Sequence, residues 1–187
     1  MNLVATDLPG VLIIVPKVFG DARGFFLESW HRDRYASHGV PADLVQDNQA
    51  YSRHGVLRGL HIQHPYSQGK LVQVVRGEVF DVAVDLRLDS PWFGRWVGVY
   101  LSGENKRQLW VPEGFAHGYY VTAEEALLSY KCSDYYHPET ELCVRWDDPQ
   151  IGIEWPLEGE PALSPKDLAG LRLGDIPTGR LPVYEGG

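Results

Sequence analysis

The chain has 187 residues, of which 44% are hydrophobic and 22% charged, and its formal net charge is −8 at pH 7. This length suits a single domain over residues 1–187, and the composition is that of a globular protein rather than a disordered one. The negative charge argues against nucleic acid or an anionic membrane as a partner, so an anionic ligand would need a local basic cluster.

The N-terminal segment, MNLVATDLPGVLIIVPK, has no basic region ahead of its apolar run, and Asp7 and Pro9 interrupt that run. It does not resemble a cleavable signal, and no apolar stretch of the chain is long enough to span a bilayer. We therefore expect a cytoplasmic protein. The first of two short predicted helices follows at residues 31–37.

Two histidine-bearing segments, GVLRGLHIQHPYSQGK and WVPEGFAHG, resemble the strand motifs of cupin β-barrels. Many cupins bind a metal through G-x5-H-x-H followed by Glu, together with P-x-G-x-x-H. His61 and His117 match these motifs, but Gln63 stands where the second histidine belongs. The expected Glu positions hold Pro65, Tyr66 and Ser67. Two imidazoles, with His64 as the one further candidate, are too few for a stable divalent site, so we predict acid/base chemistry without a metal.

His61 lies in an apolar strand that also contains glycine. Such an imidazole is either a structural group bonded to a backbone carbonyl or a titrating group that faces a barrel interior. Strict alternation places Arg58 on the opposite face of the strand from His61. If both residues serve one pocket, Gly59 should allow a bulge or a local twist between them.

Short runs with alternating hydrophobicity dominate the rest of the chain. Residues 71–75 and 79–86 alternate on either side of Arg76-Gly77-Glu78, which predicts an antiparallel pair of strands. Further strands are predicted at residues 96–101, 107–111, 126–136 and 142–146. Many short strands separated by turns predict an all-β sandwich or barrel.

Lys70 and Tyr130 are the other candidates for chemistry in the strands. A lysine at a barrel mouth is usually solvated, but a partly desolvated one stabilises negative charge on oxygen. Tyr130 alternates with Leu128 and Cys132, so its ring is expected to face inward. It is either a core residue or a protonated phenol that can donate a proton.

Cys132 and Cys143 flank a predicted turn at residues 137–140. Hairpin symmetry could bring the two thiols together, but the expected cytoplasmic location favours reduced cysteines that serve in packing.

The second predicted helix, residues 164–169, begins with Ser164 as N-cap and Pro165 at its first position. Asp167 then has two interpretations, a capping residue or a carboxylate that orients His61 and raises its basicity. The segment from about residue 171 is rich in glycine and proline, and we expect it to be loosely ordered.

Ordered motifs over residues 19 to 168 resemble the dTDP-4-dehydrorhamnose 3,5-epimerase family. They are FGDARGFFLESW, VQDNQAYS, GVLRGLHIQ, QGKLVQVVRGEVFDVAVDLR, SPWFGRWVGVYLSGENKRQLWVPEGFAHG, SYKCSDYY, IGIEWP and LSPKD. The resemblance implies a cupin-type jelly-roll barrel with one or two short peripheral helices. It also implies a homodimer that acts without a cofactor on a dTDP-4-keto-6-deoxyhexose, a sugar nucleotide.

Matching motif positions imply specific roles. The base is His61 paired with Asp167, the acid is Tyr130, and Lys70 lies near the enolate oxygen. Tyr135 is expected to stack near the nucleotide, and Arg23 to reach the site of its own or of a neighbouring subunit. The other implied substrate contacts are Glu28, Gln46, Asp47, Asn48, Arg58, His117, Glu141 and Lys166.

The chemistry explains this set of residue types. A C4 ketone acidifies the hydrogens on C3 and C5, because the carbanion is delocalised onto oxygen as an enolate. A base removes the proton, cations offset the oxygen charge, and an acid on the opposite face completes the inversion. Epimerisation at C3 only or at C5 only uses the same groups and stays open. A ketoisomerase, a metal-dependent cupin and a non-catalytic sugar-nucleotide binder are the weaker alternatives.

Overall fold

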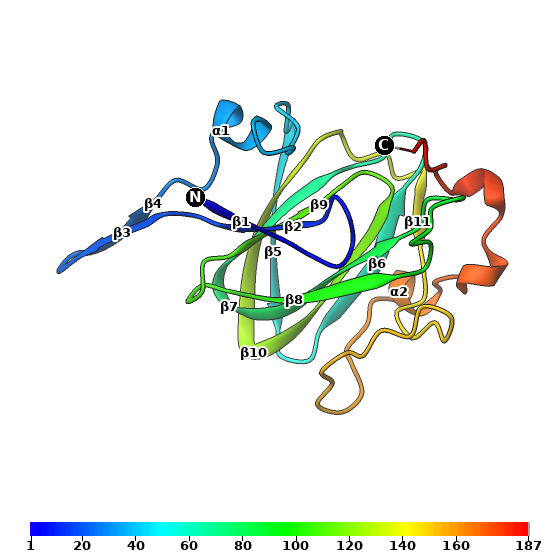
Figure 1. Cartoon of the computed structure of the whole chain (residues 1–187). Coiled ribbons are helices and arrows are strands. Elements are labelled where there is room, and N and C mark those ends of the chain that lie inside the picture. The colour runs from blue at the N-terminus through cyan, green and yellow to red at the C-terminus, as the bar shows by residue number, and fades with distance from the viewer. Residues whose placement is uncertain (187) are drawn as a thin grey trace.

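The computed structural model describes residues 1–186 and has the predicted all-β architecture, in which antiparallel strands are the dominant secondary structure (Figure 1). The strands are β1 Asn2–Ala5, β2 Leu12–Val15, β3 Val18–Asp21, β4 Gly24–Leu27, β5 Gln46–Arg53, β6 Leu57–Gln63, β7 Lys70–Asp85, β8 Trp96–Ser102, β9 Gln108–Val111, β10 Phe115–Cys132 and β11 Glu141–Cys143. Two short helices, α1 Arg32–Ala36 and α2 Pro165–Leu168, confirm both predicted helical positions.

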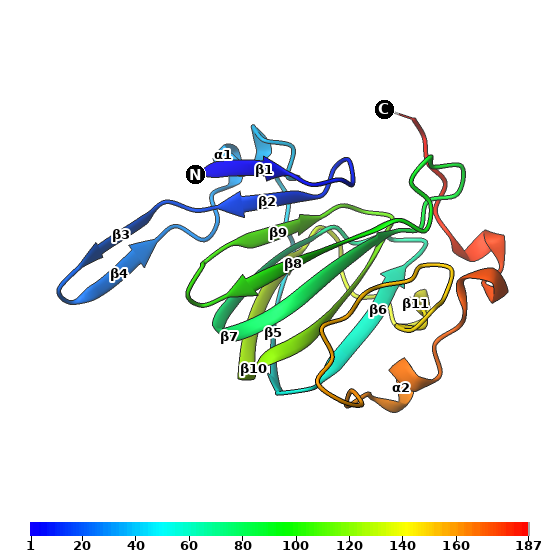
Figure 2. The same cartoon turned by 60° about the horizontal axis from the view of Figure 1, so that its bottom comes forward.

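Two long strands, β7 and β10, join the two halves of a jelly-roll barrel. The first half of β7 pairs with β9 and its second half with β8. In the same way, β10 pairs first with β6 and then with β5. Hydrogen-bonded neighbours follow the order β1-β2-β9-β7-β10-β6-β11. The two strands outside this order, β5 and β8, pair with β10 and β7 (Figure 2).

The predicted pair of strands around Gly77 is wrong, because the chain continues through Gly77 as the single strand β7. The backbone of Gly77 has φ of +79°, and an added Cβ would lie 1.8 Å from the carbonyl oxygen of Glu125 on β10. Glycine marks a bend here instead of a reversal, since only a residue without Cβ fits against the partner strand. The β7–β10 register shifts at the same level, between Val121 and Ala126.

The second half of β7 is buried on both faces of the sheet. Val79 and Ala83 of β7 pack inside the barrel, whereas Phe80, Val82 and Val84 belong to a second apolar cluster on the outer face. This outer cluster includes Leu173, Ile176 and Leu181 from the C-terminal segment. The expected loose order from residue 171 is therefore not what the structure has: this segment forms two 3-10 turns and covers the outer sheet face.

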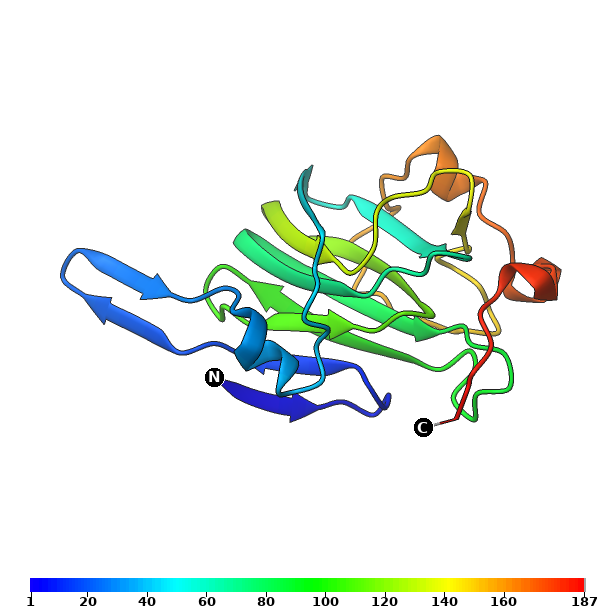
Figure 3. The same cartoon turned by 90° about the horizontal axis from the view of Figure 1, so that it is seen from above.

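The β3–β4 hairpin projects away from the barrel (Figure 3). Its aromatic side chains are largely exposed, with Phe25 at 62% and Phe26 at 68% of the full side-chain accessibility. Cys132 and Cys143 both carry free thiols. Within residues 1–186, no helix has the length and apolar character needed to cross a membrane.

Candidate active site

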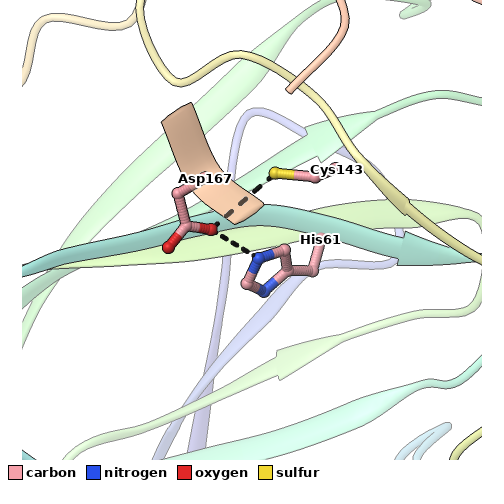
Figure 4. A group of neighbouring side chains, drawn as sticks. All are labelled: His61, Cys143 and Asp167. Atoms are coloured by element: carbon pink, nitrogen blue, oxygen red, sulfur yellow. Dashed lines mark hydrogen bonds and ion pairs between the residues drawn. The ribbon is translucent and has the colours of Figure 1, made fainter. Parts of the chain in front are cut away.

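His61 and Asp167 form a hydrogen-bonded pair at the centre of the site. His61 projects inward from β6, and its Nε2 lies 2.7 Å from Oδ1 of Asp167 on α2 (Figure 4). Asp167 is 2% exposed, whereas the side chain of His61 retains 25% of its accessibility. With an ionised Asp167 the proton resides on Nε2, which leaves the Nδ1 lone pair of His61 free to act as a base.

Asp167 makes contacts that fit both interpretations of its sequence position. Its backbone N–H donates to Ser164 Oγ at 3.2 Å, which is the N-cap contact of α2, while Ser164 Oγ donates to its Oδ2 at 2.6 Å. The N–H of Gly59 also donates to Oδ1, at 3.3 Å. Burial by itself would raise the pKa of Asp167, but the bonds from His61, Ser164 and Gly59 outweigh it and lower that pKa to about 2. The carboxylate is therefore ionised at neutral pH.

Arg58 and His61 line the same cavity although they are three residues apart on one strand. The β6–β10 register is irregular between His117 and Tyr119, and Gly59 adopts φ of +119°. An added Cβ at Gly59 would lie 2.6 Å from Cα of Gly118. The expected irregularity at Gly59 is thus present, and it turns both side chains to the barrel interior.

The cavity between the two halves of the barrel has a volume of about 320 Å³. Polar and aromatic side chains form most of its wall. The wall includes basic groups, although the protein as a whole has a net negative charge. The lining residues are Gln46, Asn48, Ala50, Arg58, His61, Ile62, Gln63, Gln68, Lys70, His117, Tyr119, Tyr130, Tyr136, Glu141 and Lys166.

Lys70 and Tyr130 reach this cavity from β7 and β10. Burial lowers the pKa of the Lys70 ammonium group and raises the pKa of the Tyr130 hydroxyl to about 12. Within residues 1–186 neither Lys70 Nζ nor the Tyr130 hydroxyl has a hydrogen-bonding partner, although both residues line a polar cavity. Such groups are suited to a ligand, Lys70 as a cation for an oxygen charge and Tyr130 as a proton donor.

Glu141 anchors a polar group at the edge of the cavity. Lys166 Nζ donates to its Oε1 and the Tyr136 hydroxyl to its Oε2, both at 2.8 Å. Burial would raise the pKa of Glu141, but these two bonds outweigh burial and lower the pKa. The network connects β11 to α2 and so holds the strand that lies beside His61.

His117 faces the cavity from β10, directly opposite His61 in the strand register. Its Nε2 lies 2.9 Å from Oδ1 of the fully buried Asp81. Gln63 is bound elsewhere: its Nε2 donates to the carbonyls of Tyr66 and Tyr135, and its Oε1 accepts from the N–H of His137 at 2.7 Å. At two positions where metal-binding cupins have ligands, this chain therefore has other contacts. His117 forms a second His–Asp pair with Asp81, and Gln63 holds the loop that contains His137.

Apart from Asp167, which contacts His61 from behind the cavity wall, four predicted site residues lie outside the cavity. Arg23 and Glu28 belong to the projecting hairpin and its end, where Arg23 pairs with Asp21 and Glu28 with Arg34. Asp47 points to the other face of β5 and pairs with Lys131 at 2.7 Å. Tyr135 is 60% exposed, and its neighbour Tyr136 lines the cavity instead. Within one chain, these four residues do not join the others.

The predictions from sequence missed Tyr119, Tyr136, Gln68 and Cys143. Tyr119 alternates with His117 along β10, so the period of the strand was the available signal. Cys143 is the cross-strand partner of His61, and its thiol donates to Asp167 Oδ1 at 3.7 Å. No local pattern indicates that contact, because three separate elements produce it.

Known proteins resemble this chain over nearly its whole length. A family model described as dTDP-4-dehydrorhamnose 3,5-epimerase matches residues 5–175. A protein of that name from Shigella flexneri is 54% identical over 177 residues, which is 94% of this chain and 97% of that protein. Another, from Neisseria gonorrhoeae, is 54% identical over 170 residues, and the match covers 91% of this chain but only 52% of that longer protein.

The likeness extends to three dimensions. The crystal structure of dTDP-6-deoxy-D-glucose-3,5-epimerase from Legionella pneumophila Philadelphia 1, in complex with dTDP-4-keto-L-rhamnose, matches this fold with a TM-score of 0.97. The two chains are 54% identical, and the match covers 99% of each.

Proposed function

The chain belongs to the dTDP-4-dehydrorhamnose 3,5-epimerase family, and from this membership we propose that it inverts C3 and C5 of dTDP-4-dehydro-6-deoxyglucose to give dTDP-4-dehydrorhamnose. The observation that carries the proposal is the His61–Asp167 pair beside a cavity that Lys70 and Tyr130 also line. The reaction requires no cofactor in this scheme, because the ketone of the substrate itself stabilises the carbanion.

His61 is the proposed base. Its Nδ1 takes the proton from C3 or C5, the C–H electron pair forms the enolate double bond, and the carbonyl electrons move to O4. Asp167 stabilises the imidazolium that results, since its carboxylate faces the other ring nitrogen at 2.7 Å. Lys70 and Arg58, which line the same cavity, offset the charge on O4.

Tyr130 is the proposed acid. Its phenol donates a proton to the carbon on the face opposite His61, and collapse of the enolate restores the ketone in the inverted configuration. A pKa of about 12 keeps the hydroxyl protonated at neutral pH until a carbanion accepts its proton. The tyrosinate then recovers a proton from solvent, and the His61 imidazolium releases to solvent the proton that it took from carbon.

The remaining cavity residues are proposed to hold the sugar nucleotide. Arg58 donates from Nε to Ser52 Oγ at 3.0 Å, which orients its guanidinium group. Gln46 and Asn48 are joined by a 3.0 Å hydrogen bond on β5, and His117, Glu141 and Lys166 complete the wall. Cationic side chains suit the diphosphate of the substrate.

We also propose a homodimer in which the hairpin of one subunit reaches the site of its partner. Arg23 and Glu28 match the family's motifs yet lie outside the cavity of their own chain. Phe25 and Phe26 of the same hairpin are exposed, and a partner surface would bury them. Such an exchange brings the two displaced polar residues to a substrate. Tyr135 stays a candidate for nucleotide stacking, because its ring is exposed near Tyr136.

Incubation with the 4-keto sugar nucleotide in deuterium oxide tests the activity. We expect deuterium at both C3 and C5 together with the inverted product, detected by NMR. His61→Asn should remove exchange at both carbons while leaving dTDP binding measurable by calorimetry. Exchange at a single carbon would replace the proposal with a monoepimerase, and carbonyl migration would indicate a ketoisomerase.

The same assay discriminates the other classes. Unchanged turnover in His61→Asn would exclude this base, and loss of wild-type turnover on chelation would favour a metal-dependent cupin.

A cytoplasmic location is part of the proposal, since the free thiols of Cys132 and Cys143 are usual in a reducing compartment. Fractionation of cells that express the tagged chain measures it.

A further inference from the structure

Three metal-ligand atoms converge beside the cavity (Figure 4). They are a ring nitrogen of His61 on β6, the sulfur of Cys143 on β11 and a carboxylate oxygen of Asp167 on α2, and all lie within 4.8 Å of one another. Imidazole, thiol and carboxylate are the three ligand types that zinc prefers in proteins. The group arises only because β11 pairs with β6 in the register that sets Cys143 against His61.

The Cys143 thiol meets the other two groups at the carboxylate of Asp167. Its S–H donates to Oδ1 of Asp167 at 3.7 Å, and His61 Nε2 lies 2.7 Å from the same oxygen. A thiophilic cation displaces that proton on binding, because the thiolate is the ligand. Cys132, in contrast, lies on β10 and contacts the Asn48 side chain at 3.6 Å.

We propose that His61, Cys143 and Asp167 form an inhibitory binding site for thiophilic divalent cations such as Zn²⁺ and Cd²⁺. This cation is not a resident cofactor. The inhibitory consequence rests on the proposed role of His61 and Asp167 in epimerisation, whereas cation binding itself does not.

Geometry explains why binding and catalysis exclude each other. Tetrahedral zinc with bonds of about 2.0–2.3 Å holds its ligand atoms about 3.3–3.8 Å apart. The nitrogen of His61 and the oxygen of Asp167 are only 2.7 Å apart, so they must separate to admit the ion between them. The cation thus replaces the hydrogen bond that orients His61. Three protein ligands leave the fourth coordination position of zinc for a water molecule. That water can come from the cavity, because the side chain of His61 is 25% exposed there.

Cadmium titration of the full chain tests binding without reference to activity. Protein treated with a chelator and then dialysed is titrated with Cd²⁺ alone, while the ultraviolet thiolate-to-cadmium charge-transfer absorption and proton release are followed. We expect saturation at one ion per chain with release of the thiol proton. Cys143→Ala should lose the absorption, and Cys132→Ala, the matched control, should keep it. No absorption in the wild type, or an absorption that survives Cys143→Ala, would overturn the site.

Zinc inhibition tests the consequence. Turnover of the sugar nucleotide is measured against free Zn²⁺ and expressed relative to each variant's own rate without metal. We expect chelator-reversible inhibition that is at least tenfold weaker in Cys143→Ala than in Cys132→Ala. Bound cadmium with no inhibition by either ion would overturn the inhibitory role. Failure of the proposed function would appear separately, as absence of wild-type turnover with an intact cadmium absorption.

Discussion

Replacement of Tyr130 should separate proton removal from inversion. In Tyr130→Phe we expect epimer formation to fall by about 10²–10⁴-fold, the usual contribution of a positioned acid or base. Deuterium should still enter the substrate, because His61 can remove a proton and return a deuteron on the same face. NMR of recovered substrate and product measures both events.

The comparison variant for this test is His61→Asn, in which both exchange and inversion should disappear. Formation of product at the wild-type rate by Tyr130→Phe would show that another group, or water, supplies the proton. Tyr119, which also lines the cavity, would then be the next tyrosine to replace.

Asp167 links the site to the pH dependence of stability. Its pKa falls from 3.8 in the reference state to about 2 in the folded chain, so folding favours the ionised form. This contribution, about 2 kcal/mol, is fully present above pH 3.8 and is lost as the pH falls through about 2. The free energy of unfolding of the wild type should therefore drop more steeply between these pH values than that of Asp167→Asn.

Urea denaturation at a series of pH values measures this slope. Asp43→Asn is the matched control, because Asp43 makes an exposed ion pair with Arg32 and such pairs contribute little. Its slope should equal that of the wild type. Parallel slopes for the wild type and Asp167→Asn would contradict the lowered pKa.

At the scale of elements, Gly77 determines whether β7 bends correctly. Gly77→Ala puts a Cβ 1.8 Å from the Glu125 carbonyl in addition to an unfavourable φ, so we expect a loss of about 3 kcal/mol or more in the free energy of unfolding. Gly39→Ala shares a positive φ but has no atom within 4 Å of the new Cβ, and should lose only about 1 kcal/mol. Equal losses in the two variants, measured by urea denaturation, would show that the close approach is unimportant.

Element prediction succeeded where a pattern is local. The N-cap of α2 was visible in Ser164, Pro165 and Asp167, because capping depends on residues a few positions apart. It failed at Gly77, because a glycine between two alternating runs indicates a turn and a bend equally well. Pairing of β7 with β10 on both sides of that glycine decides between them.

At the scale of the whole molecule, the projecting hairpin predicts the oligomeric state. Phe26→Asp places a charge on a side chain that is 68% exposed in the single chain and is buried by a partner subunit in the proposed dimer. We expect a dimer for the wild type and monomers for Phe26→Asp in sedimentation equilibrium, with activity reduced in parallel. Val183→Asp, at a 58% exposed position in the C-terminal segment, should stay dimeric. A monomeric wild type would contradict the proposed exchange of hairpins between subunits.

Packing of the whole chain also explains the order of its C-terminal segment. Residues from 171 onward lack a regular pattern, so their sequence suggests a loose tail. The apolar outer face of β7 would otherwise remain in water, and Leu173 and Ile176 cover it. The alternating strand at residues 79–86 was predicted, but the segment that covers its outer face was not.

The sequence by itself determined the all-β class, both helix positions and most residues of the cavity wall. Strand periodicity, helix caps and family motifs are local patterns, so they can be recognised in the sequence alone. Only the tertiary structure decided which groups meet. It brought Cys143 to the carboxylate that His61 contacts, turned Arg58 inward through Gly59 and left Arg23 outside the cavity. Those contacts depend on strand register and on the packing of distant segments, which no short stretch of sequence encodes.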